Sequence, residues 1–158
     1  MVLEPGVSKN VILFSRGSHR FAVAIEAIIE IIHVVKERKV PLSPPSVTGI
    51  ISVRDKIYPI VDLAVLLDLE KVKTNEDDAR MILVQVDGEA FALCADQVEA
   101  LTSFQASEWR AMDTDKNSSS SKYIHGAIQP SGYGEADLLA LDAIMSDLKS
   151  EAKRLAAT

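Results

Sequence analysis

The residues of this chain best suited to chemistry are a few carboxylates and one cysteine. Asp62 and Asp142 occupy matching places in two similar halves of the sequence, and Cys94 lies in an apolar run. Such groups can act as general acids, general bases or nucleophiles when the fold brings them into one pocket. A carboxylate that recurs with a repeat can instead accept backbone hydrogen bonds at a strand end. A small-barrel enzyme or ligand-binding protein, with Asp62, Asp142 or Cys94 in a pocket at the subdomain junction, therefore stays open as an alternative function.

The other reactive residues do not have the spacing of a metal or cofactor site. His19, His33 and His125 show no zinc-ligand spacing to one another or to the single cysteine. The seven glycines never form the Gly-x-Gly-x-x-Gly pattern that cradles phosphate. One cysteine also allows no internal disulfide, which is compatible with a reducing compartment. We therefore predict no catalytic residue, no metal and no cofactor.

Composition and charge narrow the classes of partner. The 158 residues carry a formal net charge of −6, with the basic residues scattered among acids. Phosphate contacts need a basic stripe, so a general nucleic-acid binder is excluded. The longest apolar run, residues 21–35, is interrupted by Glu26, Glu30 and His33 and is too short to cross a bilayer. The N-terminus lacks the basic start of a secretory signal. We predict a cytoplasmic protein without membrane insertion.

The sequence contains an internal duplication. Residues 11–25 read VILFSRGSHRFAVAI and residues 81–95 read MILVQVDGEAFALCA. Later in each copy Gly49 corresponds to Gly126, and Asp62 corresponds to Asp142. Each copy is small for an independent core, so one folding unit used twice is predicted. The predicted parts are a first subdomain at about 11–69, a polar linker at 70–79 and a second subdomain at about 80–148.

Short apolar runs and turn residues predict an all-β fold. Gly17 and Ser18 lie between two strand-like runs, and a charged turn at 54–56 lies between two more, so each marks a hairpin. The stretch 27–35 is ambiguous by periodicity, and its isoleucine and valine content favours a strand. Short strands joined by tight turns fit small closed barrels, because closure removes exposed edges.

Two further segments depart from the strand pattern. Residues 113–121 form a polar, serine-rich insert that is expected to be a loop. At the end of the chain, apolar residues recur on one helical face and predict a helix at about 141–157 that docks on the protein's own core. The apolar positions on this face are Leu141, Ile144, Met145, Leu148 and Leu155.

The charged turn leads to a family resemblance. Residues 49–63, GIISVRDKIYPIVDL, resemble the signature G-V-x-N-L-R-G-x-x-x-P-V-V-D-L of CheW-like proteins. Residues 21–30, FAVAIEAIIE, resemble a second segment of that family, and the duplicated layout extends the likeness over nearly the whole chain. The resemblance implies a single CheW-like domain over 1–158. Its expected fold is two five-stranded SH3-like barrels around a shared hydrophobic centre.

The resemblance also implies a function. CheW-like proteins are non-enzymatic adaptors that join the cytoplasmic tips of methyl-accepting chemoreceptors to the regulatory domain of a CheA-type histidine kinase. Whether the chain self-associates, which receptor and kinase it serves, and whether the pathway is flagellar chemotaxis or a divergent chemosensory pathway all stay open.

The family positions can be carried over residue by residue. The positions linked to receptor contact are Ile28, Glu30, Gly49 and Arg54. We hypothesise an ion pair between Glu30 and Arg54 beside the groove between the barrels, since an arginine can hold a carboxylate at two points. Ile28 would contact the receptor helix, with core packing as the alternative role. Gly49 would let another strand pass close to the backbone.

The proline-rich loop supplies the candidates for a kinase-facing edge of the first subdomain, Val40, Pro44 and Val47. The chain departs from the family pattern where Ser52 and Asp55 replace Asn and Gly around the arginine, so a different turn geometry is open. In the second copy, residues 129–134 replace the usual strand-turn continuation.

Overall fold

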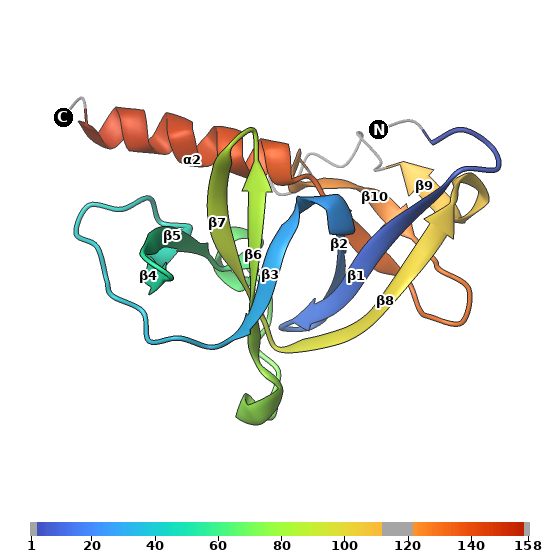
Figure 1. Ribbon diagram of the computed structural model, residues 1–158, viewed down its shortest axis with the longest axis horizontal. Helices are drawn as coiled ribbons and strands as arrows, with labels where there is room; N and C mark the ends of the chain where they lie inside the picture. Colours follow the sequence, from blue (N-terminus) through green and yellow to red (C-terminus); the bar gives the residue numbers. More distant parts are fainter. Residues whose placement is uncertain (1–2, 112–121, 157–158) are drawn as a thin grey trace.

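The computed structural model describes residues 3–111 and 122–156. Within these residues the chain forms two β-sheets and one long C-terminal helix, which runs above β6 and β7 in Figure 1. The predicted all-β fold with a C-terminal helix is confirmed. The predicted serine-rich loop at 113–121 lies outside the described residues.

The first sheet has six strands in the order β8-β1-β2-β11-β10-β9. Their bounds are β1 Ser8–Arg16, β2 His19–Ala24, β8 Gln97–Gln105, β9 Trp109–Ala111, β10 Ile124–Ile128 and β11 Ala136–Leu139. The second sheet has five strands in the order β3-β6-β7-β5-β4. Their bounds are β3 Ile28–His33, β4 Val47–Val53, β5 Lys56–Val61, β6 Arg80–Val86 and β7 Glu89–Ala95. The helices and 3-10 turns are η1 Ile25–Ala27, α1 Leu63–Leu66, η2 Glu76–Asp78, η3 Ala106–Glu108 and α2 Leu141–Ala156.

The two sequence copies exchange their first hairpins. The β1–β2 hairpin of the first copy lies in the six-stranded sheet, between β8 and β11 of the second copy. The β6–β7 hairpin of the second copy lies in the five-stranded sheet, between β3 and β5 of the first copy. The predicted bounds 11–69 and 80–148 therefore describe the repeat in the sequence, whereas each sheet combines strands from both copies.

Local turn chemistry explains the hairpins. Gly17 has a φ of +59° between β1 and β2, and the β6–β7 turn has positive φ at both Asp87 and Gly88. Positive φ values match the right-handed twist of the flanking strands, and glycine and aspartate tolerate them. The hairpin predicted at Gly17 and Ser18 is confirmed. The strand favoured for the ambiguous stretch 27–35 is also confirmed, as β3.

Each sheet closes through a segment that passes over a glycine. In the five-stranded sheet, the chain leaving the edge strand β3 returns to the opposite edge, where Arg38 and Ile50 exchange backbone hydrogen bonds of 2.9 and 2.8 Å. In the six-stranded sheet, β9 follows the edge strand β8 and pairs with β10. A Cβ atom on Gly49 would lie 2.8 Å from the Arg38 carbonyl oxygen, and one on Gly126 would lie 2.3 Å from that of Arg110. The repeat keeps glycine at both places because barrel closure requires it.

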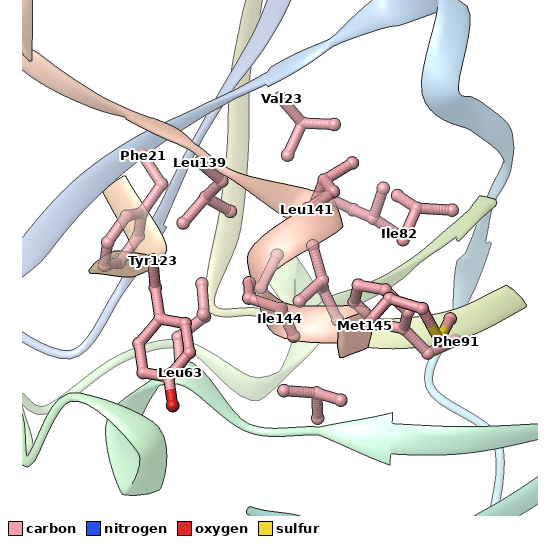
Figure 2. Packing of buried hydrophobic residues seen from close by; sticks show 14 of the residues in the cluster. Phe21, Val23, Leu63, Ile82, Phe91, Tyr123, Leu139, Leu141, Ile144 and Met145 are labelled. Carbon is pink, nitrogen blue, oxygen red and sulfur yellow. The ribbon is translucent and has the colours of Figure 1, made fainter. Parts of the chain in front are cut away.

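The buried side chains form a separate interior for each barrel and a shared centre between them. Figure 2 shows the shared centre, which contains Phe21 from the six-stranded sheet, Phe91 from the five-stranded sheet and Ile144 from α2. Met145 and Leu148 continue this buried face of α2, as predicted for a helix docked on its own core. None of the helices in the described residues is long and apolar enough to cross a membrane.

Candidate partner-binding site

Glu30 and Arg54 form the predicted ion pair on the surface of the five-stranded barrel. Arg54 Nη2 donates to Glu30 Oε1 at 2.7 Å, and Arg54 Nη1 contacts the other carboxylate oxygen. This is the two-point contact hypothesised from the sequence. The hydrogen bond from Arg54 lowers the pKa of Glu30, and the same bond raises the pKa of Arg54. The pair links β3 at one edge of the sheet to the β4–β5 turn at the other edge.

The β4–β5 turn holds the arginine in a restricted backbone conformation. Arg54 has a φ of +48° and Asp55 a φ of +66°, so both central residues of the turn are left-handed. This is the type I′ hairpin geometry. The open question about Asp55 is therefore answered: the tight turn forms although glycine is absent. A bulky residue in this region is strained by about 1–2 kcal/mol, and such strain gathers at functional sites.

A β-bulge reorients the side chains of β3. Ile28 pairs with Val84 and Glu30 pairs with Leu83, so Ile29 is the extra residue in β3. Ile28 is half-buried and packs against the shared centre, which supports its alternative role in the core. Ile29 is exposed instead. The alternation of apolar residues gave no sign of this, because a bulge depends on pairing with a distant strand.

A further exposed apolar side chain lies close to Arg54 in the sequence. Ile57, three residues after Arg54 in β5, is 66% exposed and was missed by the sequence reasoning. Gly49 is buried under Arg38, so an effect of Gly49 on a partner would act through closure of the barrel. Its close approach to another segment, as predicted, is confirmed.

The proline-rich loop presents a different surface of the same barrel. Val40 is exposed, whereas Pro44 is half-buried, and Val47 is half-buried and packs against the shared centre. Leu42 is 85% exposed and has a φ of +60°. Leu42 is therefore the most accessible apolar side chain of this loop, and it was not among the sequence candidates. The location of Leu42 between Pro41 and Pro44 was the sequence feature that could have indicated its exposure.

The three residues of the enzyme alternative do not share one pocket. Asp142 lines a hollow beside His125, and Asp62 and Cys94 line a different hollow. Asp62 caps α1 through a 2.9 Å hydrogen bond from Ala64 N and also binds Arg16. Burial raises the pKa of Cys94 to about 12, so the thiol is protonated at neutral pH and a poor nucleophile. Among the described residues, no group of histidine, cysteine and acidic side chains is placed to hold a metal ion.

Comparison with known proteins shows which family the sequence matches. Residues 10–149 match the family model of the CheW-like domain. The Chemotaxis protein CheW of Treponema pallidum is 22% identical over 150 residues, covering 93% of this chain and 86% of the relative. The Chemotaxis protein CheW of Helicobacter pylori is 27% identical over 70 residues, covering 44% of this chain and 42% of the relative.

A solved structure shares the fold. The crystal structure of the scaffolding protein TtCheW from Thermoanaerobacter tengcongensis matches with a TM-score of 0.74 and 21% sequence identity, over 84% of this chain and 89% of that one. The fold, the duplicated barrels and the family match over most of the sequence agree, and the chain belongs to the CheW-like domain family.

Proposed function

We propose that this protein is a non-enzymatic adaptor that couples the cytoplasmic tip of a methyl-accepting chemoreceptor to the regulatory domain of a CheA-type histidine kinase. Membership of the CheW-like family supports the adaptor class. The observation that carries the proposal is the Glu30–Arg54 pair, where a turn with two left-handed residues holds an exposed arginine in two-point contact with a carboxylate. The adaptor works in the cytoplasm, where receptor tips are located.

The receptor face consists of Ile28, Glu30 and Arg54, with Gly49 acting through barrel closure. Exposed Ile29 adds an apolar side chain next to Glu30, and exposed Ile57 adds one close to Arg54 in the sequence. A receptor tip is helical, and a helix docks with an apolar stripe and polar flanks. The two exposed isoleucines, one next to Glu30 and one close to Arg54 in the sequence, would supply the apolar contacts, and the charged pair would supply the polar ones.

The kinase face lies on the proline-rich loop, with Val40 and Pro44 as its sequence-derived members and Leu42 as its most exposed side chain. Val47 belongs to this face through the adjoining strand β4, although it also packs inward. The prolines of this loop restrict the backbone around Leu42, which reduces the conformational entropy lost when a partner binds the exposed leucine.

The two faces can be tested by pairwise titration. The purified protein is titrated with the kinase regulatory domain and, separately, with a receptor-tip fragment from the same genome. Arg54→Ala should weaken receptor binding about tenfold or more and leave kinase binding unchanged. Leu42→Asp should weaken kinase binding about tenfold or more and leave receptor binding unchanged. Leu42 is a better probe than Val47, because Val47→Asp would place a charge against the shared centre.

Val72 offers a matched control. It is an exposed valine in the 70–79 linker, outside both faces. Val72→Asp introduces the same charge as Leu42→Asp and should change neither affinity. If folded wild-type protein binds neither partner, or if Arg54→Ala and Leu42→Asp affect both partners equally, the proposed division into two faces is wrong.

A further inference from the structure

The chain crosses between the two sheets at two places that the internal repeat relates. The first crossing is η1, between β2 and β3, and the second is Asp96, between β7 and β8. The repeat aligns Glu26 in η1 with Asp96. It also aligns Arg16 at the end of β1 with Val86 at the end of β6, and Asp62 with Asp142. The two crossings therefore occupy equivalent positions in the repeat, but the residue that is Arg16 near one crossing is Val86 near the other.

At the Asp96 crossing, one guanidinium joins three segments. Arg16 Nε and Nη2 donate to the two carboxylate oxygens of Asp62 at 2.9 and 2.6 Å, and Nη1 donates to Asp96 at 2.8 Å. The other oxygen of Asp96 accepts from Gly17 N at 2.7 Å. Arg16 ends a strand of the six-stranded sheet, Asp62 directly follows a strand of the five-stranded sheet, and Asp96 lies between them. The triad thus connects the two barrels.

The equivalent Glu26 crossing has no arginine at the position that corresponds to Arg16. Val86 takes the place of the arginine, and the crossing contains a hollow of about 320 Å³ lined by Glu26, Val86 and Asp142. The side chains of Glu26 and Asp142 are 65% and 71% exposed, whereas those of Asp62 and Asp96 are 14% and 12% exposed. Glu26 contacts Lys9 at 3.3 Å, and Asp142 lies 3.9 Å from His125. The two crossings therefore differ in the exposure of their acids, which is lower where Arg16 binds them, although a hollow of about 480 Å³ lined by Arg16, Asp62 and Cys94 lies beside that crossing too.

We propose that Arg16 is an electrostatic latch that fixes the relative orientation of the two barrels at the Asp96 crossing, so that a change in this orientation alters the hollow at the Glu26 crossing. Two carboxylates of low exposure share one cation, and removal of that cation leaves both uncompensated. The junction must then open to hydrate them. Arg16 acts through Asp62 and Asp96 and is a positioning residue.

The consequence for binding rests on the proposed function. Ala27 lines the hollow and directly precedes Ile28 of the receptor face. The latch would therefore set the shape of the surface next to that face. The latch itself needs no partner, so it can be tested on the free protein, and its failure is distinguishable from failure of the proposed coupling.

The test measures the distance between the barrels by pulsed electron spin resonance. Spin labels are placed at Ser52 in β4 and Ser103 in β8, which are exposed residues of different sheets, in a Cys94→Ala background. Arg16→Met removes the charge at similar length and should shift or broaden the distance distribution. Arg20→Met is the matched control, because the Arg20–Glu99 pair joins two strands of the same sheet. It should leave the distribution unchanged.

Asp62→Asn and Asp96→Asn keep an oxygen for the backbone donors Ala64 N and Gly17 N while weakening the bonds to Arg16. Each should broaden the distribution less than Arg16→Met does, and they serve as the deciding variants if Arg16→Met does not fold. A wild-type distribution in folded Arg16→Met, or in both asparagine variants, would overturn the latch.

Discussion

At the scale of single residues, the candidate site depends on backbone conformation as much as on side-chain type. Arg54 and Asp55 both have positive φ, which aspartate tolerates better than arginine does. The charged hairpin tip could be found from the sequence because hairpin turns have local signals. The partner of Arg54 came from the family resemblance. The exposure of Ile29 depends on a bulge and could not be predicted from local patterns.

The turn conformation predicts a stabilising substitution. Asp55→Gly should raise the free energy of unfolding by up to about 1 kcal/mol, because glycine adopts the left-handed conformation without steric cost. Chemical denaturation measures this difference. The Arg54 position is unaffected, so receptor binding should not change. A clear loss of stability in Asp55→Gly would show that the aspartate side chain has a role of its own.

The ion pair predicts a pH dependence. Arg54 lowers the pKa of Glu30 in the folded state, so the pair contributes stability above the unfolded-state pKa of glutamate. This contribution is lost as pH falls through the lowered folded-state pKa. The melting temperatures of wild type and Glu30→Gln should therefore differ at neutral pH and converge in acid. A difference that persists unchanged at low pH would mean that Glu30 stabilises the fold by another route.

At the scale of elements, each barrel is closed by a segment that passes over a glycine, and this closure occurs once in each copy of the repeat. Turn residues predicted the hairpins and periodicity predicted α2, because both signals are local. The segment that passes over each glycine could not be identified from the sequence. Arg38 forms only an isolated bridge, and β9 is three residues long, so neither has a strand pattern of its own.

Barrel closure predicts a graded effect of glycine replacement. Gly126→Ala and Gly49→Ala should each destabilise the protein by about 1–3 kcal/mol through overpacking, with the larger loss at Gly126, where the added Cβ would also meet Trp109. Gly134→Ala is the control, since its Cβ would meet only the flexible guanidinium of Arg20. Thermal or chemical unfolding of the three variants ranks them. Equal stability of all three would contradict the role of close strand approach.

At the scale of the whole molecule, the duplication is a permanent exchange of hairpins. Each sheet takes one hairpin from the other copy, and both sheets share one hydrophobic centre with α2 (Figures 1 and 2). The two copies were visible in the sequence. Their exchange was not, because equivalent hairpins satisfy the same pattern whether they pair within a copy or between copies.

The exchange predicts that the halves depend on each other. Fragments divided within the linker at residue 75 should each be largely unfolded alone, since each lacks a hairpin of its barrel and part of the shared centre. Mixed in equal amounts, they should reassemble into a folded complex. Circular dichroism of each fragment and of the mixture checks this. A stable native-like sheet in either fragment alone would contradict the exchanged arrangement.

The most direct test of the adaptor function is whether one molecule binds both partners at once. Wild-type protein is mixed with the kinase regulatory domain and a receptor-tip fragment, and the mass of the resulting complex is measured by light scattering after size exclusion. The proposed function predicts a single species containing all three proteins, with Arg54→Ala losing only the receptor fragment and Leu42→Asp losing only the kinase domain. Displacement of one partner by the other, or binding of neither by folded wild type, would contradict it.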